Sequence, residues 1–285
     1  MKKSQTSTTA QGIALIRALE YERPPEERIC SDEFARKFVS PGYYLLGKLF
    51  AGYAERKGPG VVGFLTVRCR YMDDSLREAL DAGIGQLVVL GAGLDSRAYR
   101  FPELPGRVRV FEVDLPATQE AKIEKVRKAL GRIPDHVTYV PVDFNTEDLR
   151  KLISAGYDPR KKTLFLWEGV TYYLTAEAVD QTLAFIREHA APGSRIVFDY
   201  MDPSALTAER KRDEVKRMER TRRLTGEGLQ FGIEPSRIIE FLQRRGFGRV
   251  VNLTAADLHA RYFTGSNQSR PVAPIYNIVR AEVAG

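Results

Sequence analysis

The segment from Gln86 to Arg97 places the strongest constraint on how this chain can fold. It reads Gln-Leu-Val-Val-Leu-Gly-Ala-Gly-Leu-Asp-Ser-Arg. The apolar residues 87–90 predict a short buried strand, and Gly91 and Gly93 follow it directly. A strand that runs into a Gly-x-Gly turn lets the backbone approach a ligand that any side chain would block. The segment therefore predicts an α/β domain with a ligand site at the end of this strand.

Asp95, two residues after the turn, indicates the charge of that ligand. A carboxylate at this position would repel a phosphate, so a cationic or zwitterionic ligand such as S-adenosylmethionine fits better. A dinucleotide would also favour the pattern Gly-x-Gly-x-x-Gly, and this sequence has Ser96 at the third glycine position. An NAD-dependent oxidoreductase is thus the alternative that the turn disfavours.

Predicted strands and helices alternate from residue 85 onward. The strands are expected at 86–90, 107–113, 137–142, 163–167, 195–200, 247–253 and 274–283, and the helices at 116–130, 146–153, 175–190 and 235–245. This alternation predicts a parallel sheet with helices on both faces. No pattern of helical length separates the last two strands, so they are expected to pair antiparallel at the sheet edge.

The length of 285 residues suits one domain with a cap. We expect a single domain over 1–285, with a helical cap at 1–84, a core at 85–203 and 233–285, and a lid insertion at 204–232. Within the cap, Pro41-Gly42 is expected to end one helix, and 61–82 to form a long amphipathic helix. The lid would follow the fifth strand, over the mouth of the site.

Composition argues against a metal site and against a membrane protein. Cys30 and Cys69 are far apart in sequence, and His136, His189 and His259 are scattered, so we expect reduced thiols and no protein-bound metal. The N-terminus is polar, and no apolar run approaches the roughly 20 residues of a membrane span. A cytoplasmic protein with neither a signal peptide nor a membrane anchor is expected, of unknown oligomeric state.

The net charge of +7 is concentrated in part in the run 209–223. Acidic residues are interspersed there, which favours a solvated helix face over a nucleic-acid contact. No aromatic residues interleave the basic ones, and the chain lacks an Asn-Pro-Pro-Tyr motif, so nucleic acid is an improbable partner. The positive excess favours an anionic small molecule as the partner.

Acidic residues follow three successive strands. Glu112 and Asp114 end the second strand and point to the same side, where either could accept the hydroxyls of a ribose. Asp143 ends the third strand beside Phe144, a pair that suits an adenine, although Asp143 could also be a turn residue. Glu168 ends the very apolar fourth strand and needs a cationic partner, which could be a ligand or an arginine.

Two further groups are candidates. Arg68 and Arg70 lie on an otherwise apolar helix, where they could hold a ligand carboxylate or pair with nearby aspartates. Tyr172 and Tyr173 follow Glu168 and could wall the reacting end or pack in the core. We take Tyr173 as the candidate catalytic residue.

These residues resemble the leucine carboxyl methyltransferase family, especially its bacterial branch of S-adenosylmethionine-dependent O-methyltransferases, some linked to polyketide biosynthesis. The matching motifs lie at 67–74, 90–100, 111–116, 142–144 and 167–174, in the family's order. The resemblance covers most of 30–200. It implies a class I methyltransferase fold, which is a Rossmann-like doubly wound sheet of seven strands, the last antiparallel, with an N-terminal helical cap.

The resemblance also implies roles for the site residues. Arg68 is similar to the arginine that holds the methionine carboxylate of S-adenosylmethionine, and Gly91 to the glycine against the cofactor. Asp114, with Glu112 close by, is similar to the acid near the ribose. The remaining counterparts are Asp143 and Phe144 for the adenine, Glu168 for the methionine amine, and Arg36 or Lys37 for a cofactor-contacting lysine.

Two positions depart from the family pattern. Cys69 replaces a threonine, and Thr171-Tyr172 replaces a more apolar pair. Both departures bear on the substrate more than on the cofactor. The implied reaction is methyl transfer to an oxygen, for which alignment of the reactants is the main requirement.

A carboxylate acceptor would need no base, since it is ionised at neutral pH with a reference pKa near 4. The lack of a histidine motif fits that case, and a phenol or hydroxyl acceptor stays open. A small molecule is the favoured acceptor, and the resemblance implies a polyketide-like one. A protein C-terminal carboxylate is the alternative, and nucleic acid a less favoured one.

Overall fold

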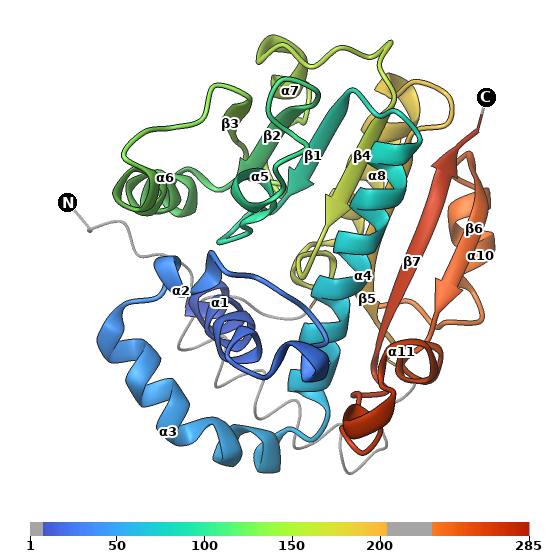
Figure 1. Ribbon diagram of the computed structural model, residues 1–285. Helices are drawn as coiled ribbons and strands as arrows, with labels where there is room; N and C mark the ends of the chain where they lie inside the picture. The colour runs from blue at the N-terminus through green and yellow to red at the C-terminus, as the bar shows by residue number, and fades with distance from the viewer. Residues whose placement is uncertain (1–7, 204–229, 285) are drawn as a thin grey trace.

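The computed structural model describes residues 8–203 and 230–284. Seven strands form one sheet in the order β3-β2-β1-β4-β5-β7-β6 (Figure 1). The strands are β1 Gln86–Leu90, β2 Arg109–Asp114, β3 Val137–Pro141, β4 Thr163–Trp167, β5 Arg195–Met201, β6 Phe247–Leu253 and β7 Tyr276–Val283. β7 is antiparallel to both of its neighbours, and the other pairs are parallel. The predicted doubly wound sheet is confirmed.

Helices surround this sheet and form the cap. The cap contains α1 Thr8–Tyr21, α2 Ala35–Phe38, α3 Pro41–Lys57 and α4 Val61–Asp81. The core helices are α5 Arg97–Arg100, α6 Pro116–Leu130, α7 Lys151–Ser154, α8 Ala176–His189, α10 Ile238–Gln243 and α11 Ala255–Tyr262. In Figure 1, α1 to α3 lie together below the left half of the sheet, and α4 runs across its middle. None of the helices in the described ranges is both long and apolar enough to cross a membrane.

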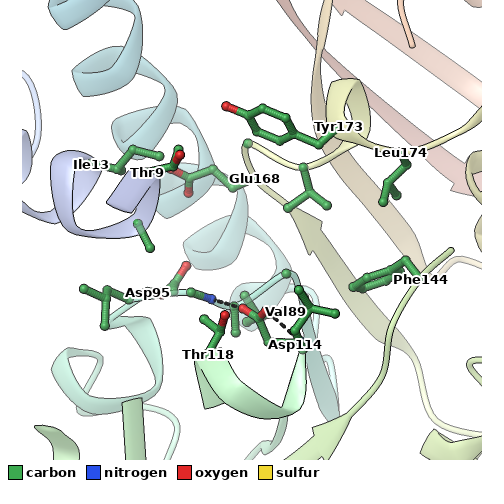
Figure 2. A pocket seen from close by; sticks show the side chains of 18 of the residues that line it. Thr9, Ile13, Val89, Asp95, Asp114, Thr118, Phe144, Glu168, Tyr173 and Leu174 are labelled. Carbon is green, nitrogen blue, oxygen red and sulfur yellow. Dashed lines mark hydrogen bonds between the residues drawn. The ribbon is translucent and has the colours of Figure 1, made fainter. Parts of the chain in front are cut away.

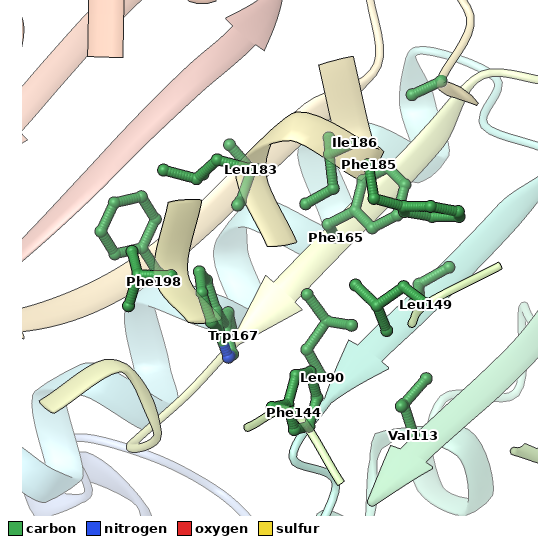
Figure 3. Packing of buried hydrophobic residues seen from close by; sticks show 14 of the residues in the cluster. Leu90, Val113, Phe144, Leu149, Phe165, Trp167, Leu183, Phe185, Ile186 and Phe198 are labelled. Atoms are coloured by element: carbon green, nitrogen blue, oxygen red, sulfur yellow. The ribbon is translucent and has the colours of Figure 1, made fainter. Parts of the chain in front are cut away.

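Hydrophobic residues on the two faces of the sheet form two large cores. β1 and β4 are buried along their whole length, which is why their sequences are continuous apolar runs rather than alternating ones. On one face, Phe165 and Trp167 of β4 pack with Leu183 and Ile186 of α8 (Figure 3). On the other face, α4 and α11 cover the sheet. A third, smaller cluster joins α1 and α2 to α6 and to Leu94.

Several predicted element boundaries were wrong. The helix expected at 146–153 is only α7, because Asp143 and Asp148 accept backbone N–H groups two residues ahead and form turns instead. Pro41 begins α3 rather than ending a helix, since proline fits a first helical turn. A helix was also missed between β6 and β7. It is α11, which Thr254 and Asp257 start with a capping box.

The sheet reverses its winding between β1 and β4. From β1 the chain adds β2 and β3 on one side, and then β4 and β5 on the other. Ligands in such sheets bind at the carboxyl ends of the strands beside this reversal. Most of the predicted lid, residues 204–229, lies outside the described residues.

Candidate functional site

A cavity of about 350 Å³ lies at this reversal, between the carboxyl ends of the strands and α1. In Figure 2, Thr9, Ile13, Glu168 and Tyr173 lie toward one end of the cavity, while Asp114 and Thr118 lie toward the other. Its lining comprises Thr9, Ala10, Ile13, Arg17, Arg68, Val89, Gly91, Ala92, Gly93, Leu94, Asp95, Asp114, Leu115, Thr118, Asp143, Phe144, Asn145, Glu168, Gly169, Val170, Tyr173, Leu174 and Gln230.

Strand register explains why residues distant in sequence meet here. Leu90 of β1 lies opposite Val113 of β2 and also opposite Trp167 of β4. The next residue of each strand is therefore Gly91, Asp114 or Glu168, and the three stand side by side at one edge of the sheet. All three line the cavity, as the positions of the strand ends predict.

Glycine is needed in this turn for its backbone conformation and packing, and not only to let a ligand approach. Gly91 has a φ of 68°, and a Cβ there would lie 2.2 Å from Cγ2 of Val170. Gly93 donates its backbone N–H to Oδ2 of Asp114 at 2.5 Å. Gly91 is thus required by its left-handed backbone and by packing against the β4 loop. The N–H of Gly93 in this turn also fixes the orientation of the Asp114 carboxylate.

Glu112 stands apart from the other predicted cofactor residues, because it is not among the residues that line the cavity. Its carboxylate is buried behind β2, 2.7 Å from Nζ of Lys122, and accepts a hydrogen bond from Tyr99 at 3.0 Å. Burial outweighs the attraction of Lys122 and raises the pKa of Glu112 to about 7. Of the two acids of β2, the structure brings only Asp114 to the cavity.

Asp143 and Phe144 both reach the cavity from the loop after β3. Oδ1 of Asp143 accepts the backbone N–H of Asn145 at 3.0 Å, which is the turn role considered as its alternative. Phe144 is largely buried and stacks on Trp167, with ring centroids 6.4 Å apart and planes 28° apart. Its ring also appears beside the cavity in Figure 2, so it joins the core to the ligand space.

Arg68 reaches the cavity from the middle of α4 although it is fully buried. Nη1 lies 2.7 Å from Oδ2 of Asp199 and 3.2 Å from the hydroxyl of Tyr172, and Nε lies 3.1 Å from Oε1 of Glu168. Nη2 is buried and has no hydrogen-bond partner among the described residues. An unpaired guanidinium nitrogen in such a place is costly, so a carboxylate from a ligand would complete it. Arg70, in contrast, pairs with Asp74 on the outside of α4.

Glu168 is bound by two arginines. Oε2 lies 2.8 Å from Nη1 of Arg97, opposite the contact with Arg68. Burial would raise the pKa of Glu168, but the two arginines outweigh it and hold that pKa below its usual value. Asp95 also pairs with Arg97, which likewise lowers the pKa of this buried carboxyl. Asp95 and Glu168 therefore stay ionised at neutral pH.

These contacts extend into one buried ion network with an excess of negative charge. Its arginines are Arg17, Arg68, Arg97 and Arg100, and its acids are Asp32, Asp73, Asp95, Glu168 and Asp199. Among the described residues the acids outnumber the arginines by one, which is one negative charge in excess when all of them are ionised; burial raises the pKa of one of these acids, Asp199. Buried charges are stable when they are compensated, so a ligand with one net positive charge suits the adjacent cavity. No cluster of metal-ligating side chains occurs within residues 8–203 and 230–284.

Helix α1 forms a part of the cavity wall that the sequence patterns did not predict. Thr9, Ala10, Ile13 and Arg17 line the cavity from one face of this helix. Arg17 donates to the carbonyl of Leu94 at 2.6 Å, directly beside the glycine turn.

A signal for Arg17 was present in the sequence, because it is an arginine in the apolar stretch Gly-Ile-Ala-Leu-Ile-Arg-Ala-Leu. The resemblance pointed instead to Arg36 or Lys37, and neither lines the cavity. Those two side chains lie over the rings of Tyr44 and Phe34.

Known proteins share both the sequence pattern and the fold. The sequence model of the leucine carboxyl methyltransferase family matches residues 10–187. A Bacillus subtilis relative, provisionally named S-adenosyl-L-methionine-dependent methyltransferase YktD, is 35% identical over 198 residues, which are 69% of this chain and 65%, just under two thirds, of its own length. A Mycobacterium tuberculosis relative with the same kind of provisional name is 30% identical over 276 residues, which cover 89% of this chain and 87% of that one.

Solved structures agree on the fold. A provisionally assigned methyltransferase from Thermobifida fusca superposes with a TM-score of 0.60 at 18% identity, over 100% of this chain and 97% of that one. The CurJ carbon methyltransferase superposes with a TM-score of 0.52 at 15% identity, over 98% of this chain and 68% of that one. At such identities the likeness concerns the fold alone.

Proposed function

Since this chain belongs to the leucine carboxyl methyltransferase family and is an S-adenosylmethionine-dependent methyltransferase, we propose that it transfers the methyl group to an oxygen, namely a carboxylate of a small molecule. The observation that carries the proposal is the sequence of side chains along one cavity. Glu168 lies at one end of the cavity and Asp114 toward the other (Figure 2), and Nε of Arg68 lies 3.1 Å from Oε1 of Glu168. This order suits a ligand with an amino-acid group at one end and a nucleoside at the other.

The donor site is built from five parts. Arg68 would hold the carboxylate through Nη2, the nitrogen that lacks a partner among the described residues. Glu168 would face the amine. Asp114 would accept the ribose hydroxyls, and Asp143 with Phe144 would hold the adenine. Glu112 is not part of this site, because its carboxylate forms a buried ion pair with Lys122.

The charge of the donor matches the charge of the site. S-adenosylmethionine carries an ammonium, a sulfonium and a carboxylate at neutral pH, and thus one net positive charge. The buried ion network has one negative charge in excess when all of its acids are ionised. A dinucleotide with its negative pyrophosphate would add to that excess instead.

The chemistry of the cavity favours an acceptor that arrives ionised. Bound S-adenosylmethionine supplies a methyl group on positive sulfur. As the acceptor oxygen forms a bond to this carbon, the carbon–sulfur bond breaks and its electron pair stays on sulfur. The cavity residues in the described ranges include no histidine, lysine or cysteine, and the lowered pKa values of Asp95 and Glu168 make them poor proton acceptors. A carboxylate needs no deprotonation, whereas a phenol with a pKa near 10 does.

Tyr173 would act by orientation rather than as a base. It lies at the same end of the cavity as Glu168, together with Thr9 and Ile13 (Figure 2). Its hydroxyl can donate a hydrogen bond to an acceptor carboxylate. These residues would align the acceptor and keep water from the reacting end.

The acceptor atom can be tested with matched compounds. The enzyme is incubated with S-adenosylmethionine and one acceptor at a time. The acceptors are an aromatic carboxylic acid, the corresponding amide, the corresponding phenol, and a peptide that has a free C-terminus. A mass gain of one methyl group is then followed through mild alkali, which cleaves a methyl ester and leaves a methyl ether intact. Alkali-labile methylation of the small acid supports the proposal, and alkali-stable or amide methylation contradicts it.

The donor assignment is tested by Glu168→Gln, which keeps the shape and removes the charge. The loss of one charged contact should raise the Kd of S-adenosylmethionine, measured by calorimetry, by about 10- to 100-fold. Glu240→Gln is the matched control, because Glu240 lies outside this cavity and pairs with Arg244 on the surface of α10. An unchanged Kd for Glu168→Gln would refute the role of that carboxylate.

A further inference from the structure

Arg97 contacts the acids of the donor site but does not itself line the cavity. It is the first residue of α5 and is fully buried. Nη1 contacts both Asp95 and Glu168, the latter at 2.8 Å. Nε lies 2.7 Å from Oδ1 of Asp73, and Nη2 lies 3.1 Å from the carbonyl oxygen of Cys69. One guanidinium therefore joins the turn after β1, the loop after β4, and α4.

We propose that Arg97 is a positioning residue for methyl-donor binding, whose guanidinium fixes the Asp95 and Glu168 carboxylates in the cavity wall and keeps both of them charged. This inference rests on the proposed function, because it takes Glu168 as part of the donor site. It assigns a role to the arginine of the Gly-Ala-Gly-Leu-Asp-Ser-Arg run, which the donor site described above does not use.

The geometry requires an arginine at this position. Asp95 follows β1 and Glu168 follows β4, and the guanidinium of Arg97 bridges their two carboxylates. The planar fork of Arg97 offers donors in several fixed directions at once, and all three of its nitrogens are engaged. A lysine has one point charge and cannot span the same set of acceptors.

Arg97 also affects whether Asp95 and Glu168 stay charged. The groups that face Arg97 and these two acids are Arg17 and Asp32 of the cap, Arg68, Cys69 and Asp73 of α4, Arg100 of α5, Lys122 of α6, Tyr172 after β4, and Asp199 of β5. Burial alone would raise the pKa of both Asp95 and Glu168, and Arg97 is the strongest influence in the opposite direction. Without it, both carboxyls would be expected to take up protons at higher pH.

Two variants separate position from charge. Arg97→Lys keeps the positive charge and loses the fork, and Arg97→Gln loses the charge. The Kd of S-adenosylmethionine is measured by calorimetry from about pH 8 down to about pH 5.5, a range in which Asp95 and Glu168 of the wild type stay ionised. Buried Glu112 of β2, with a pKa of about 7, titrates within this range, so each variant is compared with wild type at the same pH. Arg160→Gln is the matched control, because Arg160 pairs with Asp158 on the surface and is 90% exposed.

The expected result is a different pattern for each variant. Arg97→Lys should bind about 10-fold more weakly than wild type at every pH, with a Kd that follows the same pH profile as wild type. Arg97→Gln should bind weakly at high pH and progressively more weakly as pH falls, because protonation of the carboxyls removes the charges that attract the donor. Near-UV circular dichroism identifies which variants fold.

The outcomes that overturn the proposal are equally distinct. If Arg97 is merely structural, a folded variant melts at lower temperature while its Kd and pH profile match wild type. If Arg97→Gln does not fold, Arg97→Lys decides alone, and a Kd within about twofold of wild type overturns the role. If wild type itself does not bind S-adenosylmethionine, the proposed donor site fails together with this inference, whereas binding by wild type with unchanged variants refutes only the role of Arg97.

Discussion

The cavity has two walls of different origin. One wall is made by the carboxyl ends of adjacent strands, where Gly91, Asp114 and Glu168 stand in register. The other is made by α1, which reaches the cavity with Thr9, Ile13 and Arg17. Topology of the sheet determines the first wall, and packing of the cap on the core determines the second.

This difference indicates which wall would recognise which substrate. The strand ends carry most of the acids expected to hold the donor. We expect the acceptor to approach the methyl group from the side on which Thr9, Ile13 and Tyr173 lie. A buried salt bridge between Arg17 and Asp32, and contacts from Asp32 to Arg100 and from Arg100 to Asp73, join the two walls. Changes at this junction should therefore disturb both substrates, and changes in one wall should disturb mainly one.

The largest effect is expected at the junction, in Arg17→Met. Asp32 is fully buried and lies 3.3 Å from Nε of Arg17, so the variant leaves a buried carboxylate short of its partner. We expect a loss of about 3–5 kcal/mol in the free energy of unfolding, measured in urea. Arg17→Lys keeps the charge and should lose less than half as much. Equal stability of Arg17→Met and wild type would show that the two walls are not coupled here.

A smaller effect is expected within the strand-end wall, in Gly91→Ala. The added methyl group meets Val170 at 2.2 Å, and the φ of 68° disfavours alanine. A loss of stability of about 1–3 kcal/mol is expected, together with weaker donor binding. Gly83→Ala is the matched control, since Gly83 has a φ of 76° but open space around its Cβ position. Gly91→Ala should lose more stability than Gly83→Ala because of the contact with Val170. Equal losses of stability would show that this contact does not matter.

The smallest effect is expected in the cap wall, in Ile13→Ala. Ile13 is half-buried, so the shortened side chain costs only about 1 kcal/mol of apolar contact. In steady-state kinetics the KM of the acceptor should rise about fivefold while the KM of S-adenosylmethionine changes less than twofold. Ile239→Ala, on an exposed face of α10, serves as the control. A larger rise for the donor than for the acceptor would reverse the assignment of the two walls.

Sequence patterns were sufficient for the strand-end wall because its geometry is general. Apolar runs identified β1 and β4, and parallel strands place their following residues at one edge. Glu112 shows where this reasoning stops. It points to the same side as Asp114, but it lies two residues earlier on the strand and meets Lys122 of α6 instead of the cavity. Periodicity gives the side of a strand and not what covers it.

The cap wall could be predicted only in part. Arg17 in an apolar helix indicates a buried partner, yet nothing local names Asp32 or Leu94 as that partner. The missed helix α11 had a readable signal in Thr254 and Asp257. The helix expected at 146–153 failed because aspartate side chains compete with the helical backbone for hydrogen bonds.

The strand order of the sheet also has a consequence for biosynthesis. Among the described strands, β6 pairs with β7 alone, and β7 follows it in the chain and occupies the place between β5 and β6. On the ribosome, β5 and β6 must therefore wait with unpaired backbone edges until β7 emerges and is inserted between them. Such edges invite pairing with other nascent chains, so slow translation or chaperone depletion at this stage should favour aggregation over a correctly closed sheet.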